Sequence, residues 1–240
     1  MIAGPALAPG RGEGGGEGTQ ANLALVKLLQ LASPALPVGA YSYSQGLEAA
    51  IEAGLVKDEV SAREWIEDVL SLSVATMEAP IFLRLCHAWQ TNDPEQAQQW
   101  NALFLASRET AELRAETVQM GYSLVALLCN LIGPSDFDVW GDISFPAAFS
   151  YAAARWRIDV HAALVAYLWS WAENQVLAAV KTVPLGQTAG QRILAALGPA
   201  LVASAAQAAQ IDDDDMSNLA PGLALMSARH ETQHTRLFRS

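Results

Sequence analysis

Apolar residues recur every three or four positions along nearly the whole chain, and no convincing two-residue alternation interrupts them. This spacing puts apolar side chains on one face of an α-helix, whereas a half-buried strand requires alternation. Proline and glycine divide the pattern into segments, for example at Pro34, Pro37 and Gly133-Pro134. The sequence therefore predicts an all-α fold, a single globular helical bundle of about eight to ten helices.

The helical pattern divides the chain into three regions. Residues 1–20 are rich in glycine and proline and lack the apolar stretch of a signal peptide, so a disordered leader is predicted. Residues 21–211 form the predicted helical domain, in which the first helix covers 22–33. Residues 212–240 begin with a run of aspartates and are interpreted as an acidic linker followed by a C-terminal docking tail.

The charge balance bears on the possible partners. Lys and Arg number 14 against 25 Asp and Glu, which gives a formal net charge of −11. Nucleic-acid binding needs clustered basic side chains, so we expect no nucleic-acid partner. Residues 193–211 carry no charge and raise the question of a membrane span. This stretch is mostly alanine and contains Gly198-Pro199 and polar side chains, which favours a helix packed in a soluble core.

The chain has two cysteines, Cys86 and Cys129, and both lie in apolar runs with helical spacing. We predict that both are buried, reduced thiols. Reduced cysteines are typical of the cytosol, so a cytoplasmic location is expected.

Short spacings predict one helix start and one surface pair. Ser61 and Glu64 match the S-x-x-E capping box, in which each side chain binds a free amide at the start of a helix. Arg108 and Glu112 are one helical turn apart, which predicts a charged pair on the surface.

The C-terminal sequence "ARHETQHTRLFRS" contains the H-E-x-x-H pattern of zinc metallopeptidases. His230 and His234 are the candidate metal ligands, and Glu231 would activate a bound water. A catalytic zinc site needs a third protein ligand, and the residues after His234 offer no His, Asp, Glu or Cys. We therefore favour a surface helix with two exposed histidines and keep a zinc metallopeptidase as the alternative function.

The stretch "PVGAYSYSQGLE" gathers Tyr41, Tyr43, Gln45 and Glu48 around a glycine-bearing turn. Aromatic anchors surrounded by polar side chains are typical of protein interfaces, so these four residues are predicted to bind a partner. The alternative is structural, with the tyrosines capping the helical bundle.

The tail combines basic and apolar side chains. Arg229, Arg236 and Arg239 alternate with Leu237 and Phe238 in "RHETQHTRLFRS". This composition is typical of a peptide that docks on another protein.

Four stretches in the same order resemble the UreF family of urease accessory proteins. These are "LLQLASPALPVGAYSYSQGLE", "ASRETAELRAETVQMGYSL", "ENQVLAAVKTVPLGQTAGQRIL" and "RHETQHTRLFRS". The resemblance covers about residues 25–240 and leaves the glycine-rich leader outside. Members of that family commonly carry tyrosine where His234 stands, which makes the zinc pattern coincidental.

The resemblance implies an all-α, non-enzymatic chaperone that takes part in nickel insertion into urease. Such proteins dimerise, dock on a UreD-type scaffold (UreH in some organisms), recruit the UreG GTPase and act on the urease apoprotein. No tightly bound cofactor is implied, because the whole complex handles the nickel.

The resemblance also implies roles for single residues. Glu48 of the Q-G-L-E block and Lys181, before V-P-L-G-Q, would belong to the face that meets the GTPase or gates metal passage. The tail arginines and Phe238 would lie where the scaffold binds. Gln187 and Glu231 belong to the same blocks and are counted among the partner-binding residues.

A further alternative is a protein that stimulates GTP hydrolysis with an arginine finger. Arg114, Arg236 and Arg239 are candidates, and no sequence feature selects one of them.

Overall fold

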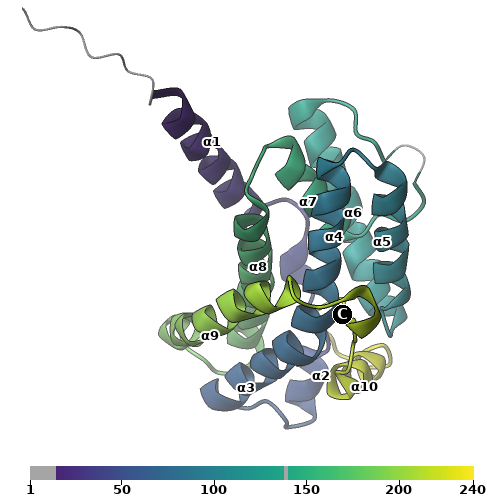
Figure 1. The fold of residues 1–240 in the computed structure, drawn as a ribbon. Coiled ribbons are helices and arrows are strands. Elements are labelled where there is room, and N and C mark those ends of the chain that lie inside the picture. The colour runs from purple at the N-terminus through teal and green to yellow at the C-terminus, as the bar shows by residue number, and fades with distance from the viewer. Residues whose placement is uncertain (1–14, 138–139) are drawn as a thin grey trace, which may run out of the picture.

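Helix α8 (Val160–Thr182) packs against α1, α2, α3, α4, α7 and α9, so it lies at the centre of the fold. The computed structural model describes residues 15–137 and 140–240, and within these residues every regular element is helical (Figure 1). The prediction of an all-α fold is confirmed. The other elements are α1 (Gly15–Leu31), η1 (Ala40–Ser42), α2 (Leu47–Glu52), α3 (Glu59–Val69), η2 (Leu70–Glu78), α4 (Ala79–Gln90), α5 (Pro94–Ala106), α6 (Ala111–Ile132), α7 (Phe145–Arg155), α9 (Gln187–Ala208), η3 (Asp213–Asp215) and α10 (Pro221–His230).

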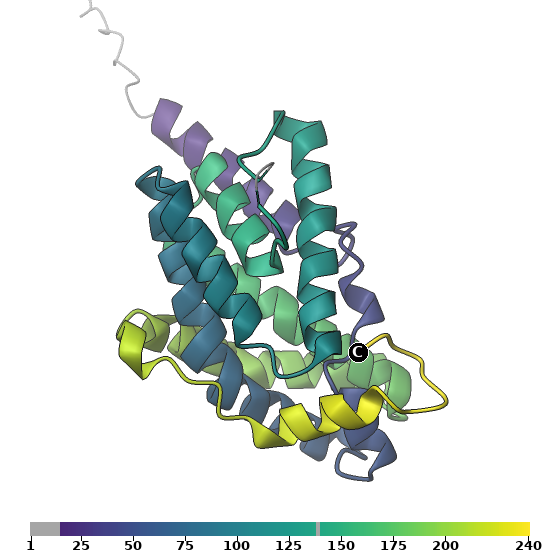
Figure 2. The same ribbon diagram turned by 90° about the vertical axis from the view of Figure 1, so that its right-hand side faces the viewer.

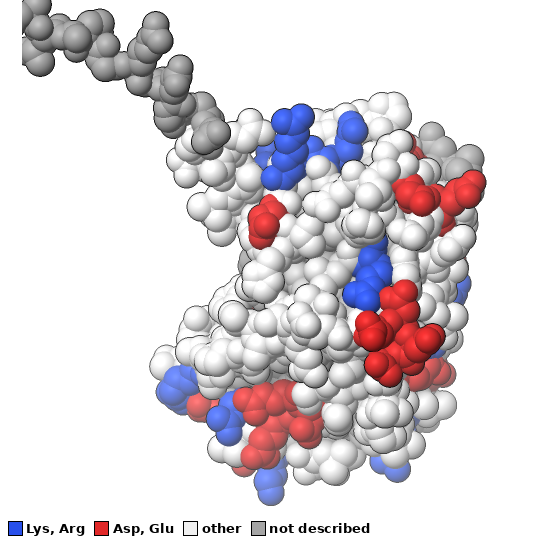
Figure 3. All heavy atoms as spheres, viewed as in Figure 1, with Lys and Arg blue, Asp and Glu red and all other residues white. Residues whose placement is uncertain are grey.

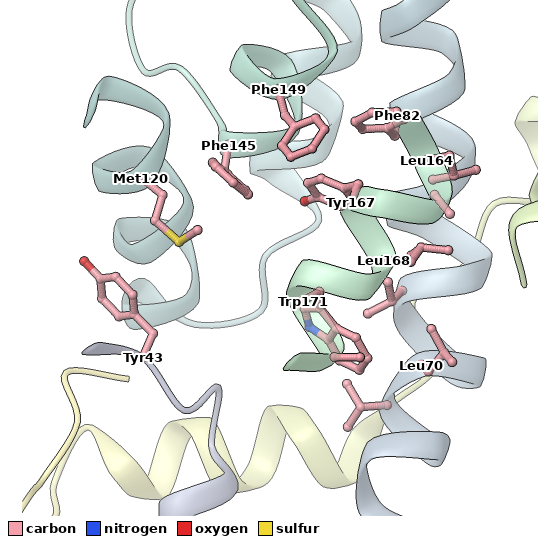
Figure 4. Close-up of a cluster of buried hydrophobic side chains, with 14 of the residues drawn as sticks. Tyr43, Leu70, Phe82, Met120, Phe145, Phe149, Leu164, Tyr167, Leu168 and Trp171 are labelled. Atoms are coloured by element: carbon pink, nitrogen blue, oxygen red, sulfur yellow. The ribbon is translucent and has the colours of Figure 1, made fainter. Parts of the chain in front are cut away.

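An aromatic cluster fills the core where α4, α7 and α8 meet. The rings of Phe82 and Phe149 lie 5.8 Å apart at an interplanar angle of 63°, and Tyr167 approaches Phe82 to 4.9 Å (Figure 4). Edge-to-face aromatic pairs add to the stabilisation that comes from burial alone. This cluster ties the central helix to its neighbours and so sets the frame for the site described below.

Helix α3 continues through η2 into α4, and η2 is a π-helical stretch. π-Helical turns are rare and occur frequently at functional sites. The carbonyls of Leu72 and Thr76 in η2 accept hydrogen bonds from the amides of Leu219 and Ser217, at 3.0 and 3.1 Å. The segment that leads into α10 is therefore fixed to the π-helical stretch.

Helix starts differ from the sequence expectations. Asp58 caps α3, its side chain accepting from the Ser61 amide, and the Ser61 side chain accepts from the Asp58 amide in return. The predicted Ser61–Glu64 box is therefore wrong, because Ser61 stands at the third position of α3 and pairs with Asp58. Helix α1 begins at Gly15, so the helix includes residues 15–20, which the sequence assigned to the leader; residues 1–14 of the predicted leader lie outside the described residues.

Helix α1 extends away from the body of the molecule (Figures 1 and 2). Leu31 at its end is buried, whereas Leu25, Val26 and Leu29 are 52%, 59% and 63% exposed. This helix therefore presents an apolar face that the described part of the chain does not cover.

The two cysteines differ. Cys86 is buried, as predicted, and burial raises the pKa of its thiol to about 12. Cys129 is exposed, so the prediction that it is buried is wrong. It lies near the end of α6, where Asn130 and Leu131 are exposed as well. An apolar run in the sequence does not reveal where a helix leaves the core.

The uncharged stretch 193–211 lies mostly within α9, where Leu197 and Leu201 are buried. Two other helical stretches, Glu59–Gln90 and Ala111–Ile132, are long and apolar enough to cross a membrane. Core helices of soluble proteins pass the same test, and 67% of the apolar window in the first stretch is buried.

On the face in Figure 3, acidic side chains gather in separate patches with much uncharged surface between them.

Candidate functional site

The C-terminal segment lies against the turn between η1 and α2. The Glu48 carboxylate accepts hydrogen bonds from two successive backbone amides, Leu237 at 2.7 Å and Phe238 at 2.9 Å. Hydrogen bonds to an ionised acceptor are stronger than those between neutral groups. Glu48, in the first turn of α2, therefore holds the C-terminal segment in place.

Ser240 fixes the end of this segment inside the protein. Ser240 is fully buried. Its main-chain oxygen accepts hydrogen bonds from the Ser44 amide and the Ser44 hydroxyl, both at 2.6 Å, and from the Gln45 amide at 3.1 Å. Its hydroxyl donates to the Glu116 carboxylate at 2.7 Å. The turn, α6 and the C-terminal segment thus share one hydrogen-bond network, which we name the clamp: Ser44, Gln45, Glu48, Glu112, Glu116, His230, Arg236, Leu237, Phe238 and Ser240.

His230 ends α10 and has no exposed surface. Its Nδ1 lies 2.7 Å from Glu112 and its Nε2 lies 3.2 Å from Glu48. Each ring nitrogen therefore lies within hydrogen-bond distance of a carboxylate group. Arg236 forms an ion pair with the same Glu112 carboxylate.

This arrangement corrects the expectation for the H-E-x-x-H pattern. His230 is buried rather than exposed, and because α10 ends there, the exposed His234 does not continue the same helical face. Both ring nitrogens of His230 face carboxylates and are not free to bind zinc. No cluster of three or more His, Cys, Asp or Glu able to hold a metal occurs among the described residues.

Gln45 has a φ of +52°, a left-handed backbone conformation that is uncommon for residues other than glycine. Its side-chain oxygen accepts from Trp171 at 2.8 Å and from Gln175 at 3.2 Å, while its amide nitrogen donates to Glu116 at 2.8 Å. Strained backbone persists where surrounding contacts hold it in place. These hydrogen bonds connect the turn to α6 and α8.

Gly46 makes the close approach of α10 possible. Its φ is +76°, and a Cβ at this position would lie 2.9 Å from the Ser227 backbone nitrogen. Only glycine combines this backbone conformation with the lack of a side chain. The glycine of the Q-G-L-E block therefore lets α10 pack against the turn.

Glu116 is a fully buried carboxyl group in the middle of the clamp. Burial raises its pKa to about 7, and the hydrogen bonds from Ser240 and Gln45 oppose this shift. The nearby carboxylate of Glu78 raises the pKa further. A carboxyl group with such a pKa changes its charge within the physiological range.

Lys181 connects the turn and the tail from the surface. Its Nζ lies 3.4 Å from the Tyr41 carbonyl, 5.7 Å from the centre of the Tyr41 ring and 5.5 Å from that of Phe238. A cation within about 6 Å of an aromatic ring is attracted by its face. Two residues singled out separately in the sequence, Glu48 and Lys181, thus contact the same short segment.

The remaining predicted binding residues fall into two groups. Tyr43 and Phe238 are buried, 6% and 5% exposed, so their rings pack inside the chain itself; for Tyr43 this is the structural alternative. The exposed residues are Tyr41, Gln187, Arg229, Glu231 and Arg239. Gln187 begins α9, and no hydrogen bond of its side chain to the clamp is recorded among the described residues. Whether any of these residues binds a partner stays a prediction.

The three candidate arginine fingers are placed differently. Arg114 pairs with Asp142 at 2.8 Å and donates to the Leu105 carbonyl at 3.0 Å. Arg236 is engaged by Glu112, whereas Arg239 is exposed and donates its backbone amide to Ser42 at 2.8 Å.

Sequence reasoning missed Glu112 and Glu116, two of the carboxyl groups that hold the tail. The predicted surface pair of Arg108 and Glu112 is wrong: the Arg108 side chain is 8% exposed and pairs with Glu78 at 3.3 Å, while Glu112 contacts His230. Glu112 and Glu116 stand one turn apart on α6. Like charges at this spacing destabilise a helix unless they find partners, and this signal could have indicated a site.

Comparison with known proteins identifies the family of this chain. A family model described as UreF matches residues 56–198. The chain is 57% identical over 225 residues to "Urease accessory protein UreF" of Azoarcus sp. (strain BH72), covering 91% of this chain and 96% of that protein. The protein of the same name from Janthinobacterium sp. (strain Marseille) is 52% identical over 222 residues, covering 90% and 98%.

Within the described residues, polar side chains of the clamp hold the chain's own segments together. The chain belongs to the UreF family of urease accessory proteins. The resemblance found in the sequence is confirmed, and the relatives are named as urease accessory proteins.

Proposed function

We propose that this chain is an adaptor in urease maturation. It assembles with a UreD/UreH-type scaffold and a UreG-type GTPase, and the complex inserts nickel into the urease apoprotein in the cytoplasm. The chain modulates GTP hydrolysis without catalysing a reaction itself. Nickel is cargo of the complex, and no tightly bound cofactor is required.

The observation that carries this proposal is the joint placement of Glu48, Lys181 and the C-terminal segment. The Glu48 carboxylate accepts a hydrogen bond from the Phe238 amide at 2.9 Å. The Lys181 ammonium group lies 5.5 Å from the centre of the Phe238 ring. Exposed apolar side chains accompany these contacts: Tyr41 is 62% exposed and Leu237 is 63% exposed. A surface held in place before binding loses less conformational entropy when a partner docks.

We assign this surface to the GTPase, with Tyr41, Lys181 and Leu237 as the contact residues. Glu48 acts there by positioning Leu237 and Phe238 through their amides. The exposed side of α10, with Leu225 and Arg229, is assigned to the scaffold. The buried Phe238 reaches a partner only if the segment moves.

A second copy of the chain is the proposed occupant of the apolar face of α1. Leu25, Val26 and Leu29 are each more than half exposed, and none of them is charged. An apolar face of this kind is complementary to itself, as the two-fold interface of a homodimer requires. Val26→Asp with Leu29→Asp is expected to turn a dimer into a monomer, as measured by the mass in solution. Leu219→Asp, which changes an equally exposed leucine, is the control.

Co-purification with a UreD-type scaffold and a UreG-type GTPase tests the adaptor function. Lys181→Ala and Leu237→Asp are expected to release the GTPase while the scaffold stays bound. The matched controls are Lys57→Ala and Leu219→Asp, which change exposed residues elsewhere. The proposal fails if the wild-type chain forms no complex, or if urease matured without this chain carries its full nickel content. If the complex forms but both variants retain the GTPase, only the assigned surface is wrong.

A further inference from the structure

A cavity of about 130 Å³ lies between the end of α1, the η1 turn and α8. Apolar side chains form much of its wall, among them Leu36, Met120 and Phe145. Polar side chains also line it, and these include Glu78, Arg108 and Glu116. The cavity thus combines an apolar wall with a few polar groups, as sites for small molecules do.

Arg108 is the polar group that points to a ligand. Its side chain is 8% exposed, its Nη1 lies 3.3 Å from the Glu78 carboxylate, and its Nη2 donates to the Ser107 hydroxyl at 3.3 Å. The guanidinium carbon lies 4.3 Å from the centre of the Phe104 ring. The third guanidinium nitrogen, Nε, is buried and has no hydrogen-bond partner among the residues that the structure describes.

A buried donor without an acceptor is rare and costs about 1 to 3 kcal/mol relative to a satisfied one. A ligand that brings an acceptor to Nε would recover this loss. The orphan donor is therefore an observation independent of the cavity, and both indicate the same place.

The charges around the cavity restrict the ligand. Glu78 is already paired with Arg108, and the Glu116 carboxyl group accepts from Gln45 and Ser240. An anionic ligand would meet these two acidic groups, and a cationic ligand would meet the guanidinium group. A neutral molecule avoids both kinds of repulsion.

We propose that this cavity binds a small neutral organic molecule that carries one hydrogen-bond acceptor. The acceptor oxygen binds Nε of Arg108, and the apolar part contacts Met120 and Phe145. The volume suits a molecule of about six to eight heavy atoms, because an apolar protein cavity of about 150 Å³ binds benzene. This site goes beyond the adaptor function and does not depend on it.

The first test compares three probes on the full chain by methyl NMR of labelled methionines. Cyclohexanone supplies a neutral acceptor, methylenecyclohexane has the same shape without oxygen, and cyclohexanecarboxylate supplies a negative charge. Cyclohexanone is expected to shift the Met120 methyl signal and to bind at least about fivefold more tightly than the other two probes. Equal binding of cyclohexanone and methylenecyclohexane by the wild-type chain would overturn the proposal.

Two variants locate the site. Arg108→Lys keeps a cation near Glu78 but removes Nε, so the preference for cyclohexanone should fall below about twofold. Met120→Trp fills the cavity and should abolish binding, whereas the control Leu219→Trp, at an exposed position, should leave it unchanged. Unchanged cyclohexanone binding by folded Met120→Trp would also overturn the proposal. If Arg108→Lys does not fold, the comparison of the three probes on the wild-type chain and the Met120→Trp variant still test the proposal.

Discussion

The hydroxyl of Ser240 donates a 2.7 Å hydrogen bond to the carboxylate of Glu116, although 124 positions separate the two residues. Ser240 is fully buried and Glu116 is 5% exposed. The end of the C-terminal segment is thereby attached to α6 inside the protein. The stability of this attachment depends on a carboxyl group whose charge changes near neutral pH.

Glu116 is predicted to make stability fall with rising pH. Its folded-state pKa is raised from 4.5 to about 7. A raised pKa means that the group's stabilising contribution is complete below pH 4.5 and is lost as the pH rises through 7. The expected loss in the free energy of unfolding is about 3 kcal/mol. Glu116→Gln should remove most of this loss and should be more stable than wild type at pH 8. Urea unfolding at pH 4.5 and pH 8 measures the effect. Glu64→Gln, at an exposed position, should follow the wild-type pH dependence.

Glu48→Ala is predicted to free the C-terminal segment. The change removes the acceptor for the amides of Leu237 and Phe238 and one neighbour of His230. A loss of about 2 to 4 kcal/mol in the free energy of unfolding is expected, because each hydrogen bond to a charged group contributes about 1.5 to 3 kcal/mol and they are not additive. Hydrogen exchange of the two amides should accelerate. Glu52→Ala, on the exposed side of the same helix, should change neither quantity; continued protection of both amides in Glu48→Ala would contradict the role of Glu48.

His230→Ala should be strongly destabilising, and His234→Ala should be nearly neutral. The first change leaves Glu48 and Glu112 facing a cavity without the imidazole ring between them. Leaving a buried hydrogen-bonding group without its partner costs about 1 to 3 kcal/mol, whereas a surface change costs about 0.5 kcal/mol or less. Thermal unfolding measures both variants, with and without a zinc chelator. A chelator that lowers the wild-type melting temperature would instead favour the metallopeptidase alternative.

Gly46→Ala should destabilise the protein more than Gly39→Ala. Both glycines have a left-handed backbone, with φ of +76° and +79°. A Cβ at position 46 would meet the Ser227 backbone, whereas a Cβ at position 39 has nothing within 4 Å. The backbone strain of about 1 kcal/mol is common to both, and the close contact should add about 1 to 3 kcal/mol at position 46. Chemical denaturation measures the loss in the free energy of unfolding for each variant. Equal losses would show that α10 moves away from the added Cβ with no loss of stability.

Thiol labelling of the native protein should modify one cysteine per chain. Cys129 is exposed, whereas burial of Cys86 raises its pKa to about 12 and keeps it protonated. The thiolate is the reactive form, so Cys86 should react only when the chain unfolds. Mass spectrometry counts the labels, and Cys129→Ser should abolish the fast reaction. Two rapidly modified thiols would contradict the burial of Cys86.

The sequence was sufficient for the fold class and for the choice of the turn and the tail. Helical periodicity predicts elements well because it depends on neighbours along the chain. Gln45, Glu48 and Phe238 were all selected before their contacts were known, because their composition is unusual for a connector. The roles of Ser44 and Ser240 were not predicted, because single polar residues in a turn or at a chain end carry no local signal.

His230 illustrates the limit. In the sequence it belongs to a motif with His234, four positions away, and the pattern points to zinc. In the structure its neighbours are Glu112 and Glu48, 118 and 182 positions away. Ionisable groups respond to whatever lies within a few ångströms, and only packing decides which groups those are.

The sequence by itself thus determined the all-α class, the family and the two stretches that carry the unusual residues. The tertiary structure decided that Glu48 holds the tail, that Phe238 is buried and that Glu116 titrates near neutrality. The physical reason is the separation along the chain of the residues that decide each property. Helix formation depends on residues three and four positions apart, whereas burial, hydrogen-bond pairing and charge depend on segments that meet only when the chain has folded.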